Sequence, residues 1–458
     1  MTSTGMPPSP LGRRLSTVAH VVLWVFLASA LFEGYLFIPG LPGQSLLSVL
    51  EKVVAIPLPL AALYFWWWFR PAGQWVVGIY TAWLVWVLIA YLAHQPHDNL
   101  TQYYTETQIG GWLTLLAAWV LARHPLYIRR FWQIGLPVAW VATIAIGLWE
   151  IHTGHHIGPS SVAGRPIPSV FYFNPNDLGT ALGLLLPLVW FWPAAFRRPD
   201  LRRWAPPAAG VLTLLLFYIL VKTGSRGGEV AVLLDLVALP FVLAGRARRW
   251  AVAGLAALVA VMAGLIVWAR HQGPASHLPL ALSKLARLPD LVTGLFHIQT
   301  NLPAGVAPGS MTIRWALYRS GFWALEQNPW GLGPRGAMRW YVYWVHHHSP
   351  FNTYGIVDAH NLWLEVAVNY GWLGFVLFVG GYVGIALAAR RAALRGPTPL
   401  TRGLGAAVFA GLVGFVVGSL SPSSVMIGFL VMWVVLGLGL AAWRLAEPDR
   451  RAFASDAQ

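Results

Sequence analysis

The stretch WLGFVLFVGGYVGIALAARR, residues 372–391, decides how the rest of this chain should be read. Its first 18 residues carry no charge, and Arg390 and Arg391 end it. A run of this length and composition is typical of a helix that crosses the hydrocarbon core of a bilayer. Similar apolar segments recur along the chain. The twelve predicted membrane-spanning helices cover residues 16–38, 53–69, 73–93, 108–122, 131–149, 178–196, 205–221, 228–245, 250–269, 372–389, 403–420 and 424–443.

The composition supports an all-α integral membrane protein. Of 458 residues, 57% are hydrophobic and only 10% are charged, against about 25% charged in an average soluble protein. The 26 Trp and 15 Tyr suit many crossings of the membrane interface. The absence of cysteine excludes disulfides and thiolate chemistry. The net charge of +15 does not indicate a nucleic-acid partner, because the basic residues lie between apolar segments. The first segment is long enough to span, which argues against a cleaved signal peptide.

The number of basic residues alternates between high and low in successive connections between the predicted spans. Twenty of the 31 basic residues lie in the N-terminal segment, the tail and every second connection. The short intervening connections carry only Lys52, Arg165, Lys222 and Arg226. The positive-inside rule therefore predicts cytoplasmic termini and a periplasmic loop at residues 270–359. We predict three parts: residues 1–269 with nine transmembrane helices, the loop 270–359 with amphipathic helices, and residues 360–458 with three transmembrane helices and a cytoplasmic tail.

The turn Lys222-Thr223-Gly224-Ser225-Arg226-Gly227-Gly228-Glu229 joins two predicted spans on the outer side. Its glycines allow close backbone approach, and the Arg226 guanidinium offers a fork of donors suited to phosphate oxygens. The alternative is a simple hairpin in which Arg226 pairs with Glu229. The order of its Lys and Ser excludes a P-loop.

The large outer loop carries a second group of arginines. Residues 314–324 have apolar residues at helical spacing, which predicts an amphipathic helix at the membrane surface that begins near Arg314. The alternative is that this helix only exposes a solvated basic face. Further on, Asn328-Pro329-Trp330-Gly331-Leu332-Gly333 precedes Arg335 and Arg339, which we interpret as surface or lipid-headgroup residues.

His360 closes the loop, followed by Asn361 and a predicted helix that is interrupted at Asn369-Tyr370-Gly371. An imidazole titrates near working pH and suits a general base, although a histidine at a helix start is more often a cap or packing residue. The clusters His152, His155, His156 and His346-His347-His348 lack metal-ligand spacing and are interpreted as loop surface. Asn174-Pro175-Asn176-Asp177 is typical of a turn and helix cap.

Several catalytic motifs are missing from the sequence. There is no Asp-x-Asp pair, no Gly-x-Ser-x-Gly and no His-Glu-x-x-His, which argues against a metal-dependent nucleotide-sugar transferase, a serine hydrolase and a zincin. The predicted spans hold few ionisable residues, mainly Glu33, Glu229 and Asp235. A proton-coupled transporter would usually show more of them.

Three segments together resemble the O-antigen ligase and polymerase superfamily of polytopic membrane glycosyltransferases. They are Thr223-Gly224-Ser225-Arg226-Gly227-Gly228; Arg314 with Asn328-Pro329-Trp330-Gly331-Leu332-Gly333; and His360-Asn361-Leu362-Trp363-Leu364-Glu365, ending in Gly371-Trp372-Leu373-Gly374. Each motif is short, and their order around a large outer loop strengthens the match. The resemblance implies a GT-C-like membrane enzyme of the bacterial inner membrane with a periplasmic active site.

The resemblance also implies a reaction and roles for residues. The donor would be a glycan on undecaprenyl diphosphate, and the acceptor a sugar hydroxyl of lipid A-core. His360 would be the general base, and the diphosphate would be bound by Arg226 and Arg314, with Arg165 and Lys222 as lesser candidates and Asn361 and Glu229 in support. Transfer would be inverting, with no metal and no cofactor; the partners would be the two substrates and membrane lipids.

Other functions stay open at this stage. An O-antigen polymerase would extend a second lipid-linked unit, and a protein O-oligosaccharyltransferase would transfer to protein hydroxyls; the chain length and the His-Asn-x-x-Leu form favour the ligase. From other classes, a flippase for lipid-linked glycans would share the basic outer cavity, and a scaffold would bind partners through the loop alone. Formation of a covalent product in detergent distinguishes an enzyme from both.

Overall fold

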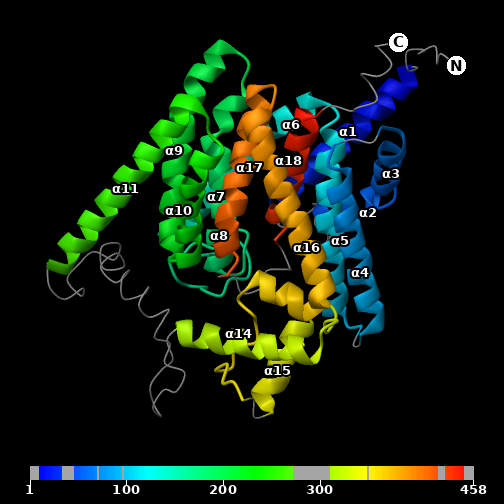
Figure 1. Cartoon of the computed structure of the whole chain (residues 1–458), viewed down its shortest axis with the longest axis vertical. Coiled ribbons are helices and arrows are strands. Elements are labelled where there is room, and N and C mark those ends of the chain that lie inside the picture. The colour runs from blue at the N-terminus through cyan, green and yellow to red at the C-terminus, as the bar shows by residue number, and fades with distance from the viewer. Residues whose placement is uncertain are drawn as a thin grey trace.

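The computed structural model describes residues 10–32, 46–69, 72–94, 97–271, 310–347, 350–420 and 429–447. The described residues are helical or irregular and contain no β-strand. Most of the helices run roughly side by side, whereas α14 lies across the lower end of the bundle with α15 beside it (Figure 1). The predicted all-α class is therefore confirmed.

Each of the twelve apolar segments falls at least partly on a helix. The bounds are α1 Pro10–Ala30, α2 Leu46–Val54, α3 Pro57–Phe69, α4 Gln74–Ala93, α5 Asn99–Leu121, α6 Pro125–Arg130, η1 Phe131–Gly135, α7 Leu136–Thr153, α8 Pro175–Trp190, η2 Trp192–Ala195, α9 Pro199–Thr223, α10 Arg226–Ala238, η3 Leu239–Phe241, α11 Gly245–His271, α14 Ser310–Gln327, α15 Gly336–His346, α16 Leu362–Arg395, α17 Pro399–Gly418 and α18 Leu430–Ala446.

In the part of the chain that the structure describes, fewer than twelve helices are both long enough and apolar enough to cross a membrane. Five helical stretches among the described residues meet that test, and the bent pair α2 and α3, which meet at 47°, would make a sixth. Proline explains part of the shortfall: α8 and α10 are followed by 3₁₀ turns that contain Pro193 and Pro240, where a missing N–H ends the α-helical ladder. Several helices are therefore long and apolar enough to cross a membrane, and twelve crossings stay a prediction.

The helix α18 forms the centre of the core. It is buried along almost its whole length between α5, α16 and α17, as expected for a helix that is apolar on every side. Its Trp433 ring lies 5.5 Å from the rings of both Tyr80 and Trp83 of α4. The absence of side chains at Gly437 and Gly439 lets neighbouring helices approach closely.

A second, smaller core lies where α14 and α15 meet the first turns of α16. Leu317, Tyr341 and Leu364 are buried in it, together with Ala324, Ala337, Ala359 and Val368. The predicted helix near Arg314 is thus present as α14. It is held against the membrane bundle by packing and is not a free interfacial helix.

Candidate active site

The helix α16 is broken at Gly371, where φ is +66° and ψ is −173°. The segment Pro329–Gly333 inserts at this break. The N–H groups of Leu332 and Gly333 donate to the carbonyl oxygens of Val368 and Asn369 at 2.9 and 2.8 Å, and Trp372 N–H donates to Pro329 O at 3.0 Å. The predicted interruption at 369–371 is therefore confirmed, and its broken helical hydrogen bonds are replaced by the inserted segment.

Two further polar groups at the break have hydrogen-bond partners. Trp86 Nε1 of α4 donates to Tyr370 O at 2.7 Å. The Asn369 side-chain oxygen accepts from Ala337 N at 2.7 Å, which caps the start of α15. A Cβ on Gly331 would lie 2.5 Å from Asn369 O, so only glycine allows this approach. The Asn328–Gly333 motif thus joins the outer helices to the bundle.

His360 lies at the start of α16 in the left-handed backbone region, with φ of +49°. Asn361 is the N-cap, and its side chain accepts from Leu364 N at 3.2 Å. Leu362 N–H donates to Ser419 O at the end of α17 at 3.1 Å. A bulky residue with positive φ is uncommon, and such strain clusters at functional sites. His360 is half-buried, which is compatible with a reactive group at a surface.

The turn between α9 and α10 is built around two glycine contacts. Gly224 ends α9 with φ of +68°. Ser225 is fully buried and caps α10 by accepting from Gly228 N at 3.3 Å. A Cβ on Gly228 would lie 2.5 Å from Gly179 O of α8. With the backbone fixed in this way, the turn leaves the Arg226 side chain exposed.

The end of α17 brings the α9–α10 turn and the start of α16 together. Gly418 O accepts from Thr180 Oγ1 of α8 at 3.0 Å. A Cβ on Gly418 would lie 4.0 Å from Gly227 O. The adjacent Ser419 carries the carbonyl that bonds Leu362. The backbone segments that carry Arg226 and His360 therefore both lie against the end of α17, although the two residues are 134 positions apart in the sequence.

Arg314 joins the same region through a residue that the sequence analysis missed. Tyr318, one turn further along α14, forms a side-chain hydrogen bond with Asn361 and lies within electrostatic reach of Arg314. Burial is the main cause that raises the pKa of the Tyr318 phenol. The four-residue spacing between Arg314 and Tyr318, which places both side chains on one face of a helix, was the signal in the sequence that could have identified Tyr318. Nearby, burial raises the pKa of Asp358 to about 6.

The other predicted residues occupy distinct positions. Lys222 is exposed, with its ammonium 5.5 Å from the Tyr218 ring centroid, and Glu229 is half-buried in the first turn of α10. Arg165 is exposed on the loop between α7 and α8.

Two expectations need correction. Arg335 and Arg339 are half-buried, not free surface residues: Arg335 pairs with Asp98 at 3.0 Å, and Arg339 donates to Leu332 O at 2.7 Å. His156, interpreted as loop surface, has a buried side chain that faces Glu150 at 3.4 Å. Among the described residues no group of three or more His, Asp or Glu is arranged to hold a metal ion.

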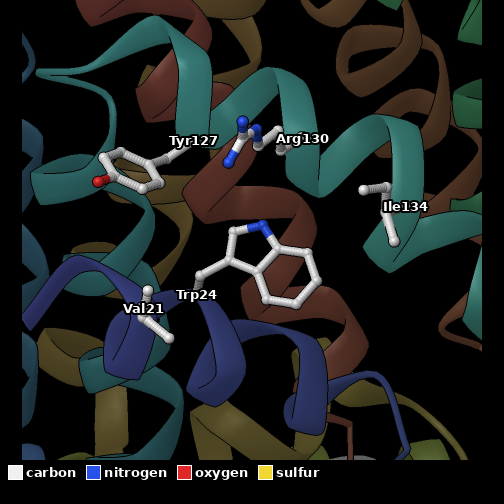
Figure 2. Close-up of a pocket in the computed structure, with 5 residues that line it drawn as sticks. All are labelled: Val21, Trp24, Tyr127, Arg130 and Ile134. Carbon is white, nitrogen blue, oxygen red and sulfur yellow. The ribbon is translucent and has the colours of Figure 1, made fainter. Parts of the chain in front are cut away.

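An apolar groove of about 1130 Å³ lies between α3, α4, α5 and α16. Trp66, Trp86 and Trp112 line it, with Leu373 and Leu377 from the part of α16 that follows the break. Two polar groups of its wall pair with each other, because Trp112 Nε1 donates to Thr81 Oγ1 at 3.2 Å. The groove therefore suits a hydrocarbon chain. A pocket of about 210 Å³ between α1 and α6–η1 contains none of the predicted site residues (Figure 2).

Two comparisons with known proteins found matches to this chain. A family model described as O-Antigen ligase matches residues 211–379, a range that includes Arg226, Arg314 and His360 but not Arg165. A curated relative, the teichuronic acid biosynthesis protein TuaE of Bacillus subtilis (strain 168), is 24% identical over 344 residues, which are 71% of this chain and 64% of the relative. The match thus spans less than two thirds of that relative's length.

Proposed function

We propose that this chain is an O-antigen ligase of the O-antigen ligase and polymerase superfamily of membrane glycosyltransferases, as the family match over residues 211–379 supports. It transfers a glycan from undecaprenyl diphosphate to a sugar hydroxyl of lipid A-core at the periplasmic face of the bacterial inner membrane. The main support is that the Arg226 turn and the start of α16 meet at the end of α17, while α14 reaches the start of α16 through Tyr318 and Asn361.

The reaction requires one bond to form and one to break. The acceptor hydroxyl oxygen attacks the anomeric carbon from the side opposite the diphosphate, so the configuration inverts. The bond between that carbon and the diphosphate oxygen breaks, and the lipid diphosphate leaves with the electron pair. His360 takes the hydroxyl proton, a contribution of about 10²–10⁴-fold in rate.

The arginines act on the leaving group. Negative charge grows on the diphosphate in the transition state, and a fixed guanidinium stabilises that charge more than it stabilises the ground state. Arg226 is presented on a turn whose backbone is held by Ser225 and Gly228, and Arg314 stands one helical turn from Tyr318. Arg165 and Lys222 add positive charge, and Asn361 and Glu229 support the two backbones.

The lipid part of the donor matches the apolar groove. The groove offers no unpaired polar atom from Thr81 or Trp112, and Trp86 and Leu373 connect it to the break in α16. A hydrocarbon chain in this groove would leave its headgroup near the outer helices. This placement supports a lipid-linked substrate over a water-soluble nucleotide sugar.

Polymerisation is the second candidate, because the relative TuaE is named for biosynthesis of teichuronic acid. In that reaction the acceptor is another lipid-linked unit, and the same base and arginines would serve. A protein O-oligosaccharyltransferase would differ only in its acceptor. A flippase would move the donor without forming a covalent product.

One experiment separates these functions. Purified protein in detergent is mixed with undecaprenyl-diphosphate glycan and, in separate reactions, lipid A-core, a second lipid-linked unit or a serine-rich protein. The ligase predicts that lipid A-core alone gains the glycan, measured by gel shift and mass spectrometry. Extension of the second lipid-linked unit would identify a polymerase, and no product with any acceptor would contradict an enzyme.

A further inference from the structure

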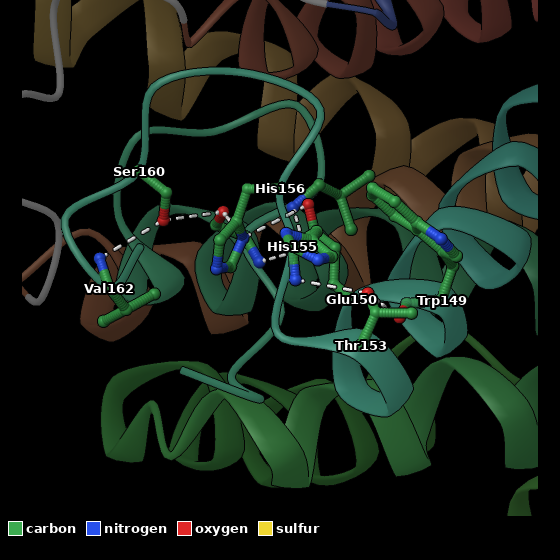
Figure 3. A network of polar contacts seen from close by, with 9 residues as sticks. Trp149, Glu150, Thr153, His155, His156, Ser160 and Val162 are labelled. Atoms are coloured by element: carbon green, nitrogen blue, oxygen red, sulfur yellow. Dashed lines mark hydrogen bonds and ion pairs between the residues drawn. The ribbon is translucent and has the colours of Figure 1, made fainter. Parts of the chain in front are cut away.

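A fully buried carboxylate at the end of α7 has no part in the reaction described above. Glu150 Oε2 accepts hydrogen bonds from the backbone N–H groups of Ser169 and Val170, at 2.7 and 2.9 Å. The second of these residues has a left-handed φ of +53°, which is unusual for a β-branched side chain. The carboxylate thus holds a strained segment of the loop between α7 and α8 (Figure 3).

His156 extends this anchor. Its Nδ1 lies 3.4 Å from Glu150 Oε1 and 3.1 Å from Ser169 Oγ. One ring nitrogen therefore faces both partners. In a hydrolase triad the acid and the serine contact different nitrogens of the ring. The arrangement consequently does not activate Ser169, which is itself buried.

From His156 a chain of hydrogen bonds leads to Arg165. Ser169 Oγ donates to Ser160 Oγ at 3.0 Å, and Val162 N–H donates to Ser160 Oγ at 3.3 Å (Figure 3). Val162 O then accepts from Arg165 N at 3.0 Å. The buried Glu150 is thereby connected, through His156 and the two serines, to the backbone of an exposed arginine.

The backbone of Arg165 is held on its other side as well. Its carbonyl accepts from Ile167 N at 2.8 Å, which closes a three-residue turn. A Cβ on Gly154, the left-handed cap of α7, would lie 3.7 Å from the Arg165 carbonyl carbon. Arg165 itself is an exposed residue.

The loop ends next to the candidate site. It leads into Asn174, which caps α8, and Gly179 of α8 packs against Ser225 of the Arg226 turn. The loop and α14 lie toward the same end of the bundle (Figure 1).

We propose that Glu150 and His156 are positioning residues that present Arg165 to the diphosphate of the donor. This inference rests on the proposed function, in which arginines bind that diphosphate. An exposed arginine on a mobile loop would lose conformational freedom when it binds phosphate. A loop ordered in advance by a buried carboxylate avoids that cost and makes the contact stronger.

The test is a double-mutant cycle on donor binding with Glu150→Gln, Arg165→Ala and the pair. We expect each single change to raise the donor KM about ten- to hundredfold, the loss of one charge-assisted hydrogen bond, with the acceptor KM unchanged. The pair should be no worse than Arg165→Ala alone. His155→Ala, at the exposed neighbour of His156, is the matched control and should behave as wild type.

Two outcomes would overturn the proposal. Additive losses in the pair would mean that Glu150 acts elsewhere, and an unchanged donor KM in Arg165→Ala would remove the residue being positioned. If Glu150→Gln does not fold, His156→Gln and Ser169→Ala replace it in the same cycle. A separate variant tests the proposed function. If His360→Ala retains full transfer, the proposed function is contradicted, whatever the double-mutant cycle shows.

Discussion

Two glycine-containing segments serve opposite purposes at the same end of the bundle. In the segment Asn328–Gly333 the glycines let backbone dock onto backbone, and its polar groups are used to repair the break in α16. In the α9–α10 turn, glycine packing onto α8 fixes a backbone whose arginine is exposed. The first segment builds the site, and the second presents a side chain to it. Short motifs of one family can thus have structural or chemical roles that only their contacts distinguish.

The largest expected effect is at His360, the proposed general base. His360→Ala should reduce glycan transfer by about 10²–10⁴-fold, because the acceptor hydroxyl loses its base. Thermal stability should stay close to wild type, since the half-buried His360 is not part of the hydrophobic core. The measurement is product formation with purified donor and acceptor. His360→Asn tests the same point with a residue that tolerates positive φ, and near-normal transfer by either variant would contradict the base assignment.

At the break in α16, where residues 329–333 dock, Gly371→Ala should destabilise the protein. A Cβ there would lie 2.3 Å from the Trp330 carbonyl carbon, and φ is positive. We expect a lower unfolding temperature and reduced transfer together, at a cost of about 1–3 kcal/mol or more for the strained backbone alone. Gly380→Ala in the same helix meets no atom within 4 Å and is the control. Equal stability of the two variants would refute the docking role.

A smaller effect, confined to the donor, is expected at Arg226. Arg226→Ala should raise the donor KM and lower kcat by about ten- to hundredfold in total, because one charge-assisted contact to the diphosphate is lost. Acceptor KM and thermal stability should not change. Arg248→Ala, an exposed arginine at the start of α11, is the control. If Arg226→Ala weakens the acceptor instead, its assignment to the diphosphate is wrong.

A change at Asp358, two residues before His360, should alter stability in a pH-dependent way. Burial raises the pKa of Asp358 from 3.8 to about 6. The folded state therefore holds the proton more tightly, and this stabilisation is full below pH ~4 and lost as pH rises through about 6. Asp358→Asn should stabilise the protein at pH 7 by up to about 3 kcal/mol and much less at pH 4. Thermal unfolding at the two pH values measures it, and a pH-independent difference would contradict the burial.

Local features of the site were predictable. Asn174 caps α8 through its side chain, and α16 breaks at Gly371, because both signals depend on residues within one or two turns. The resemblance of three motifs to one superfamily was also readable and is confirmed by the family match. The structure places Arg226 and His360 on backbones that meet, which agrees with their predicted shared role without testing the chemistry.

Other residues could not be assigned from the sequence. His156 was interpreted as surface, yet its ring is buried against Glu150, because the loop folds back onto α7. Arg335 and Arg339 were interpreted as surface and are held by Asp98 and Leu332. In each case the partner is either on another element or across a loop closure, where hydropathy and spacing carry no information.

The helical membrane class and the order of the motifs can be read from the amino-acid sequence alone. These follow from apolar length, charge alternation and local backbone preferences, all of which act between near neighbours in the chain. Three contacts depend on the fold: Tyr318 meets Asn361, residues 329–333 supply hydrogen bonds at the break in α16, and a buried carboxylate anchors the loop of Arg165. Those contacts arise because buried polar groups must find partners, and packing alone selects which distant residues supply them.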